Sequence, residues 1–245
     1  MCEKRDNLLR FSVPADFLES SLMRFEELNS RYKDRKVAEV YGQITTGRVT
    51  ASGRMPDNLP QVDLKRLEKY IRQCRRYNIE FDYTLNASCM GNRELNEESR
   101  EDVSQFLLSL DSAGVSSYTV ALPALIDLIK QILPGRAIKA SAICEINSVW
   151  KALHYHSLQV ERIVVDPDIT RRFDILRSIC RNFGQNVEII VNNACLRNCP
   201  YKMFHYNHEA HSRKDCSEKE NRQFYYHKCS LQKAQDSSNY IKLNW

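Results

Sequence analysis

The sequence predicts an α/β fold: a TIM-like (β/α) barrel, complete or truncated, followed by a cysteine-rich C-terminal segment. Three observations support this class. Short β-branched or aromatic runs alternate with longer segments of helical periodicity, a pattern typical of a parallel sheet with crossover helices. The length of 245 residues suits an α/β barrel of one domain. The periodicity ends near Val191, and four cysteines follow within residues 195–229.

Seven strands and six helices are expected from the spacing of apolar residues, which repeats every second residue in a strand and every three to four in a helix. The expected strands are 11–13, 37–44, 79–85, 117–122, 138–143, 162–165 and 187–191. The expected helices are 16–32, 63–77, 97–113, 124–133, 148–157 and 170–183.

Several boundaries carry a physical signal of their own. Asn96 can cap a helix whose first turn holds Glu97 and Glu98, where acidic side chains favour the positive end of the helix dipole. Gly114 and Gly184 each follow a helical pattern, where glycine tolerates the left-handed conformation of a helix C-terminus. These boundaries agree with a repeated β/α unit.

The organisation follows from these elements. Residues 1–191 form the expected barrel, and residues 192–245 form a cysteine-rich segment that is expected to pack on it. The longest irregular stretch within the repeat, residues 47–60, comes after the second strand. In a barrel that loop lies at the C-terminal rim, where loops build active sites.

Composition narrows the function classes only slightly. The 36 basic and 31 acidic residues leave a net charge of +5, which favours anionic partners weakly. No apolar stretch approaches the roughly 20 residues of a membrane helix, and the first residues, MCEKRDNLLR, lack the apolar core of a secretory signal. We therefore expect a soluble cytoplasmic protein without a membrane span.

The four late cysteines are spaced as Cys195-x3-Cys199-x16-Cys216-x12-Cys229. Clustered cysteines in the reducing cytosol are more typical of metal ligands than of disulfides. Four thiolates are a full ligand set for a 4Fe-4S cluster, and zinc accepts the same set. Both cofactors stay open on the spacing alone.

Several motifs between residues 37 and 199 resemble peptidase family U32 in their order. Val-Ala-Glu-Val-Tyr-Gly (37–42) resembles the early strand of the family, and Thr-Leu-Asn (84–86) its TLN signature. Asp-Ser-Ala-Gly-Val (111–115), Lys-Ala-Ser (139–141) and Arg-Ile-Val-Val (162–165) are similar to later segments of the family. Val-Asn-Asn-Ala-Cys (191–195) resembles the VHGALC motif that opens its cysteine region.

The resemblance implies a barrel and an iron–sulfur cluster on Cys195, Cys199, Cys216 and Cys229. It also implies oxygen-independent hydroxylation of an RNA, a quinone precursor or a peptide, with prephenate or a similar compound as the oxygen donor. Family members that work in pairs suggest a second U32-like or modifying-enzyme subunit as a partner. The leading expectation is thus an iron–sulfur enzyme of hydroxylase type.

Candidate site residues come from the barrel geometry, because strand ends meet at one rim. Arg48 and Arg54, on the long second loop, are candidates for bidentate binding of a dicarboxylic donor. His205 opens a set of histidines at every third position, with His208 and His211. The remaining substrate-binding candidates are Tyr41 and Gln43, and the catalytic candidates are Asn86, Ser141, Asp166, Asn192 and His205.

Two other function classes remain open. The chain can be a non-catalytic iron–sulfur partner of a modifying complex, or a metal-dependent peptidase or hydrolase. The sequence has neither a His-Glu-x-x-His motif nor a Gly-x-Ser-x-Gly motif, so a hydrolytic reading depends on the family name alone.

Overall fold

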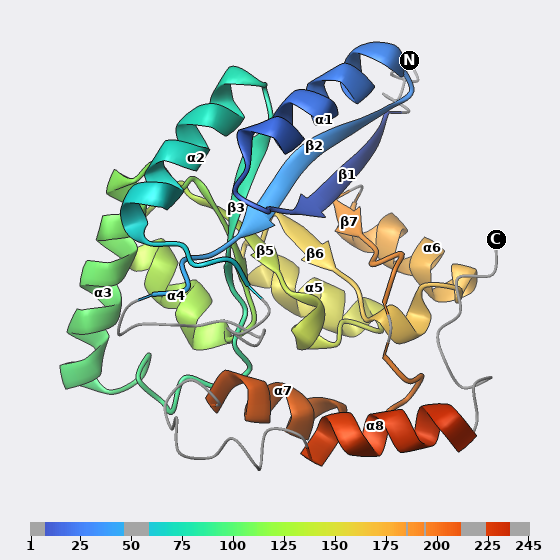
Figure 1. The fold of residues 1–245 in the computed structure, drawn as a ribbon. Coiled ribbons are helices and arrows are strands. Elements are labelled where there is room, and N and C mark those ends of the chain that lie inside the picture. Colours follow the sequence, from blue (N-terminus) through green and yellow to red (C-terminus); the bar gives the residue numbers. More distant parts are fainter. Residues whose placement is uncertain (1–7, 47–58, 185, 194, 212–223, 236–245) are drawn as a thin grey trace.

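Seven parallel strands form one curled sheet in which each strand pairs with its neighbours in sequence, from β1 to β7 (Figure 1). The computed structural model describes residues 8–46, 59–184, 186–193, 195–211 and 224–235. The strands are β1 (Leu9–Pro14), β2 (Arg35–Gly42), β3 (Glu80–Leu85), β4 (Ser117–Val120), β5 (Ala137–Ala140), β6 (Arg162–Val164) and β7 (Val187–Glu188). The predicted parallel α/β sheet is confirmed.

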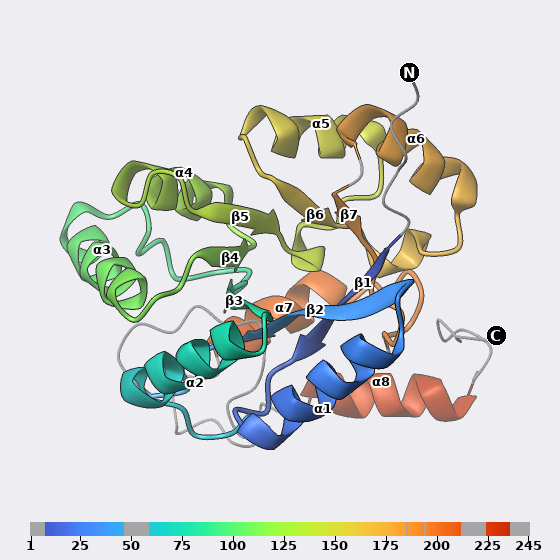
Figure 2. The same cartoon turned by 90° about the horizontal axis from the view of Figure 1, so that it is seen from above.

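Six crossover helices cover the outer face of the sheet in chain order (Figure 2). They are α1 (Glu19–Arg31), α2 (Leu64–Arg76), α3 (Glu97–Ser112), α4 (Pro123–Ile132), α5 (Val149–Ser157) and α6 (Phe173–Phe183), and two short 3-10 helices follow β5 and β6, η2 (Ala142–Cys144) and η3 (Pro167–Ile169). Within the described residues no ladder joins β7 to β1. The sheet is therefore a curled, open half-barrel, the truncated form of the predicted barrel.

The expected boundaries hold at most elements, and the deviations have local causes. The Asn96 side chain accepts bonds from the backbone of Glu98 (3.0 Å) and Ser99 (3.4 Å), as expected of a cap. Gly114 and Gly184 have φ angles of +95° and +104°. The predicted strand 138–143 was too long, because the Ser141 side chain caps η2 and ends the extended backbone. Similarly, β7 ends at Glu188 rather than at residue 191.

The apolar core lies between the sheet and its helices. Val40, Val120 and Ile163 point outward from the strands and are completely buried against helical side chains such as Leu107 and Ile129. Burying a side chain of this size contributes about 2 kcal/mol. The inner face of the sheet carries mainly polar and charged groups, unlike the branched apolar layers usual in such barrels.

Two further helices follow the sheet, α7 (Lys202–His211) and α8 (Phe224–Gln235). Both lie across the side of the sheet at which the strands end (Figure 1). Apolar periodicity did not predict them, because neither helix has a strong apolar stripe. None of the described helices is long and apolar enough to span a membrane.

Candidate functional site at the C-terminal rim

The ends of β2 and β3 form a small pocket at the C-terminal rim. Tyr41 and Gln43 come from the end of β2, and Thr84 and Asn86 from the end of β3. The Thr84 hydroxyl is within hydrogen-bond distance of the Gly42 carbonyl (3.1 Å) and of Gln43 Oε1 (3.2 Å), which ties the two strand ends together. Three residues predicted from strand ends, Tyr41, Gln43 and Asn86, thus share one pocket.

The chemistry of this pocket is neutral. Among the described residues that line it, none carries a charge, and the polar groups are amides and hydroxyls. Phe17 and Pro14 supply apolar walls beside them. Such a surface can bind and orient an uncharged polar group, because amides and hydroxyls both donate and accept hydrogen bonds.

An ion cluster next to β6 anchors the C-terminal segment to the rim. Lys202, the first residue of α7, is 9% exposed, and its Nζ lies 2.6 Å from Asp166 Oδ1, 3.2 Å from Asp168 Oδ2 and 3.8 Å from Glu145 Oε1. Burial opposes the charge on Lys202, but the Asp166 hydrogen bond and the neighbouring carboxylates outweigh it and raise its pKa. The amine therefore stays protonated and acts as an anchor rather than as a nucleophile.

This anchor gives the catalytic candidate Asp166 a structural role. Its Oδ1 also accepts the backbone N–H of Asp168 (3.0 Å), which begins the 3-10 helix η3. Ser141 has a similar role, since its hydroxyl accepts the N–H of Ile143 (3.2 Å) at the start of η2 and the residue is buried. Asn192 is exposed beyond the end of β7.

His205 and its neighbours belong to an aromatic contact between α7 and α8. The His205 ring stacks on Tyr225 with centroids 5.6 Å apart and an interplanar angle of 19°, and His208 meets the same ring edge-on at 5.5 Å. Nε2 of His205 lies 3.2 Å from Oε1 of the buried Glu209. Glu209 thus orients His205, as a carboxylate orients an imidazole in a proton-transfer site.

Two of the predicted metal ligands lie on the turn that the anchor holds. Cys199 accepts the backbone N–H of Lys202 through its carbonyl (3.2 Å), and Cys195 is close enough to raise the pKa of Tyr206, after burial as the main cause. Cys195, Cys199 and Cys229 are half-buried. A metal site needs three or four donors around one point. The described residues include no group of three His, Cys, Asp or Glu side chains with such an arrangement.

The other predicted site residues, Arg48, Arg54 and Cys216, lie outside the described residues. Of the remaining cysteines, Cys74 is buried and Cys144 is half-buried. Burial raises the pKa of Cys74 to about 12 and that of Cys144 to about 11, so both remain protonated at neutral pH.

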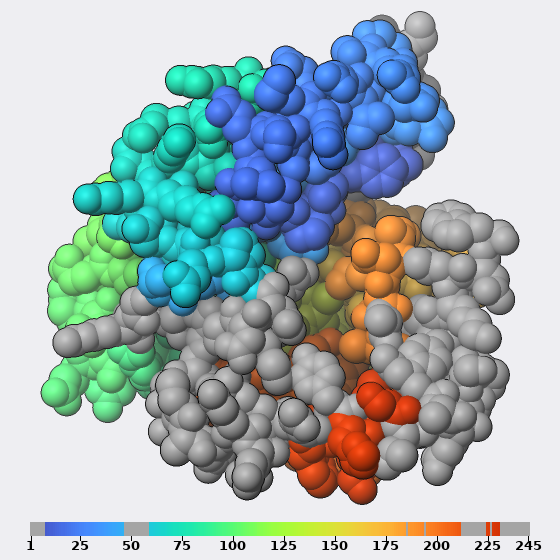
Figure 3. Space-filling view, in the orientation of Figure 1, coloured from blue at the N-terminus to red at the C-terminus, as the bar shows by residue number. Residues whose placement is uncertain are grey.

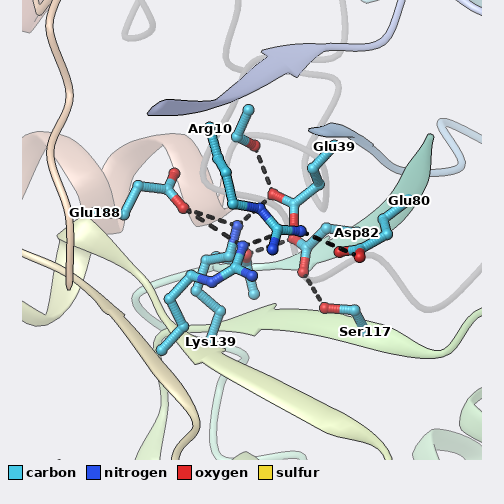
Figure 4. Close-up of polar contacts among 10 residues, drawn as sticks. Arg10, Glu39, Glu80, Asp82, Ser117, Lys139 and Glu188 are labelled. Atoms are coloured by element: carbon cyan, nitrogen blue, oxygen red, sulfur yellow. Dashed lines mark hydrogen bonds and ion pairs between the residues drawn. The ribbon is translucent and has the colours of Figure 1, made fainter. Parts of the chain in front are cut away.

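A charged network lies inside the curled sheet (Figure 4). Lys139 on β5 lies 2.5 Å from Glu39 on β2 and 3.0 Å from Glu188 on β7, so it connects opposite sides of the curled sheet. Arg162 on β6 reaches the second oxygen of Glu39 at 2.9 Å. Glu39 and Lys139 are each 3% exposed. Glu39 stands two residues before Tyr41 on the same strand, so this layer supports the pocket from below.

The protonation of this network follows from its geometry. Burial disfavours the charge of Glu39, but Lys139, Ser12 and Arg162 outweigh it and lower its pKa. Burial also disfavours the charge on Lys139, yet the surrounding carboxylates raise its pKa. Asp82 is fully buried; burial raises its pKa to about 6, against the opposing effect of Lys139. It accepts hydrogen bonds from Ser117 (2.6 Å) and Thr119.

The network was absent from the predicted site, although the sequence contained a signal. Glu39, Asp82 and Lys139 each interrupt a strand that otherwise reads as buried. Charged residues are seldom fully buried unless they are paired, so three of them at strand centres indicate a paired interior. Lys202 had no comparable signal, because its partners lie 34 or more residues away.

Asp82→Asn should increase stability most at neutral pH. The folded carboxyl binds its proton more tightly than the unfolded one, whose pKa is 3.8, so its contribution to the free energy of unfolding is largest below pH 4 and falls as the pH rises to about 6. The free energy of unfolding of the variant, relative to that of the wild type, should therefore increase by on the order of 1–3 kcal/mol as the pH rises from below 4 to above 6. Urea unfolding of both proteins at pH 4.5 and at pH 7.5 measures the difference.

Glu80→Gln is the matched control, since Glu80 lies on the same strand with 60% of its side chain exposed. We expect it to change stability by less than about 0.5 kcal/mol at either pH. A gain from Asp82→Asn that is the same at both pH values would contradict the assignment of a proton to Asp82.

A curled parallel sheet with crossover helices, and with polar side chains gathered where the strands end, defines a protein of the α/β barrel class whose candidate site is at the C-terminal rim. The sequence model of peptidase family U32 matches residues 34–242. The chain therefore belongs to peptidase family U32.

Two relatives are informative. The uncharacterized protease MJ1657 of Methanocaldococcus jannaschii is 29% identical over 206 residues, which are 84% of this chain and 61% of that protein. The chain thus spans less than two thirds of this relative. The structure of the U32 peptidase Mk0906 superposes with a TM-score of 0.66 at 15% identity, over 90% of this chain and 87% of the other.

A more distant similarity agrees on the fold alone. An O-GlcNAc hydrolase of Thermobaculum terrenum superposes with a TM-score of 0.50 at 10% identity, over 76% of this chain and 47% of that enzyme. Together with the U32 structure, it supports the barrel architecture rather than a particular reaction.

Proposed function

We propose that this U32 protein is an oxygen-independent, iron–sulfur-dependent modifying enzyme of hydroxylase type. Its acceptor substrate is an RNA, a quinone precursor or a peptide. This acceptor binds at the rim pocket. The observation that carries the proposal is the Lys202 anchor, which holds the turn with Cys195 and Cys199 on the rim where the strands that form the pocket end. Family membership supports the cofactor and the reaction class.

The residues of this chain have distinct roles in the proposal. Cys195, Cys199, Cys216 and Cys229 would hold a 4Fe-4S cluster, which would supply electron transfer and activation of a prephenate-like donor. Arg48 and Arg54 bind the donor carboxylates. The neutral side chains of the pocket orient the acceptor.

Three side chains of α7 near Cys195 and Cys199 carry protons in this proposal. Tyr206 remains a phenol because burial raises its pKa, and Lys202 remains an ammonium. His205, oriented by Glu209, is the candidate to move a proton, because the two ring nitrogens of an imidazole can donate and accept one. Its stacking on Tyr225 fixes the ring plane.

The test of the cofactor is metal analysis of protein purified without oxygen. Brown protein with about four irons and four sulfides per chain supports the proposal. Colourless protein with about one zinc would replace the cluster with a zinc site. Absence of metal after anaerobic reconstitution would reject a metal at these cysteines.

Cys199→Ala should remove most of the bound metal, because a four-thiolate site loses a ligand and its geometry. Cys74→Ala, a matched change at a fully buried thiol of α2, should leave the metal content unchanged. Iron, sulfide and zinc are measured per chain for both variants, together with visible absorption. Equal loss from both variants would contradict the ligand assignment.

A metal-dependent peptidase or hydrolase is the second candidate, favoured by the name of the M. jannaschii relative, an uncharacterized protease. It predicts a colourless zinc protein that loses hydrolytic activity when the metal is chelated. A non-catalytic partner subunit is the third candidate. It predicts that the chain binds a cluster but modifies no acceptor until a second subunit is added.

A further inference from the structure

The outer face of the sheet is not covered by a described helix at its open edge, between β7 and β1. Helices α1 to α6 cover the sheet, but among the described residues no helix covers the outer face between α6 and α1, where β7 and β1 end the sheet (Figure 2). In a complete eight-unit barrel, another strand and helix occupy this position. Outward side chains here therefore lack the cover that a helix gives the rest of the wall.

On β1 the alternation of side chains determines what is exposed. Arg10 and Ser12 point into the barrel, where each contacts a carboxylate, so Leu9 and Phe11 point outward. They are 56% and 39% exposed. Elsewhere in the sheet, outward apolar residues such as Val40 are completely buried.

Exposed apolar residues also follow β7. Glu188, the last residue of β7, reaches Lys139 inside the barrel, and Ile189 and Val191 come directly after this strand end. Ile189 and Val191 are 44% and 41% exposed. The orange surface of this segment and the indigo surface of β1 lie near one another on one face of the molecule (Figure 3).

Helix α1 contributes the border of this surface. Its Glu19 contacts α2, and Leu28 stands nine residues later, which is two and a half turns and therefore the opposite flank. Leu28 is 43% exposed, and Tyr32, which follows the helix, is 42% exposed. The edge surface is defined by these six residues: Leu9, Phe11, Leu28, Tyr32, Ile189 and Val191.

The charge on both sides of the edge surface is positive. Residues 24–36, in α1 and the start of β2, include five basic and three acidic residues. Residues 171–181, in and before α6, include four basic and one acidic residue. These two segments together carry an excess of +5, equal to that of the whole chain. The rest of the chain has equal numbers of basic and acidic residues. The excess of positive charge is therefore concentrated in the two segments beside the exposed apolar side chains.

We propose that the edge surface binds an amphipathic helix of a partner polypeptide, with its apolar stripe on these six residues and Asp or Glu on its flanks. A helix suits the position because the rest of the barrel wall packs helices on the same outward strand residues. Acidic flanks suit it because basic segments border both sides. A second copy of this chain is disfavoured, since it would bring the same positive segments together.

Fluorescence anisotropy with two synthetic peptides tests this inference. Both peptides carry the same leucine stripe at helical spacing, one flanked by glutamates and the other by lysines. The acidic peptide should bind at least about tenfold more tightly, and added salt should weaken its binding. Phe11→Asp should weaken binding at least about tenfold, and the double change Arg177→Glu with Arg181→Glu should weaken it and reduce its salt dependence.

Trp150→Ser is the matched control, because Trp150 is 77% exposed on α5, a helix that does not border the edge. It should bind the acidic peptide like the wild type. Equal affinity for both peptides, or equal loss in Phe11→Asp and Trp150→Ser, would overturn the inference.

Sedimentation of the protein without peptide tests whether a second copy of this chain, rather than an acidic partner, occupies the edge surface. A dimer that Phe11→Asp dissociates would assign the edge surface to a second copy and would overturn the acidic partner. Thermal unfolding verifies that each variant is folded. If Phe11→Asp does not fold, the double change Arg177→Glu with Arg181→Glu tests the inference instead. Both arginines lie at exposed helix positions, so replacing them should not disturb folding.

Discussion

Lys139→Met should destabilise the protein by about 3–5 kcal/mol, because it removes one partner of a buried ion network. Lys139 bridges Glu39 and Glu188 at 2.5 and 3.0 Å, closer than Arg162 does at 2.9 and 3.9 Å, and it also offsets the buried charge of Asp82. Without it, the two glutamates keep Arg162 as a partner, but the fully buried Asp82 loses the opposing charge of Lys139. A domain of this kind is typically stable by 5–15 kcal/mol, so the loss is a large fraction of the total.

The pH dependence of this loss is part of the prediction. In the variant, the pKa values of Glu39 and Asp82 should rise, because the positive charge of Lys139 no longer lowers them. The folded state then binds protons more tightly than the unfolded state, so lowering the pH from 7 toward 5 should reduce the deficit relative to the wild type. Urea unfolding at both pH values measures the effect.

Lys65→Met on α2 is the matched control, since Lys65 is exposed. It should change stability by no more than about 0.5 kcal/mol. A small and pH-independent loss from Lys139→Met would mean that water, rather than this lysine, compensates the interior carboxylates.

Lys202→Met should release the C-terminal segment from the rim. Asp166 would remain buried beside Asp168 without its counter-ion, which costs on the order of 3–5 kcal/mol if the segment stays in place. Detachment is the less costly response, because it exposes both carboxylates to water. We therefore expect faster hydrogen exchange in α7 and faster proteolysis between β7 and α7, with little change in exchange of β2 to β4.

Two further variants make the test specific. Lys228→Met changes an exposed lysine of α8 and should leave exchange in α7 as in the wild type. Asp166→Asn combined with Lys202→Met should recover part of the lost stability, because no uncompensated charge then remains at Asp166. Unchanged exchange in α7 of Lys202→Met would show that aromatic contacts with Tyr225 suffice to hold the segment.

The candidate site was predictable where strand ends form it. Tyr41, Gln43 and Asn86 each end a strand with a clear apolar pattern, and adjacent parallel strands bring their ends together. The roles of Ser141 and Asp166 were not predictable in this way. Their side chains cap short 3-10 helices, a local choice of the backbone that strand periodicity does not encode.

The sequence by itself determined the order of strands and helices, their parallel arrangement and the residues that reach the rim, because these depend on local periodicity and short connections. Only the tertiary structure decided that Lys139 joins β2 to β7, that Lys202 fastens α7 to Asp166, and that the barrel wall stays open between β7 and β1. These contacts join residues 36 to 100 positions apart or depend on the curvature of the whole sheet. Local spacing carries no information about such distances, so packing alone fixes them.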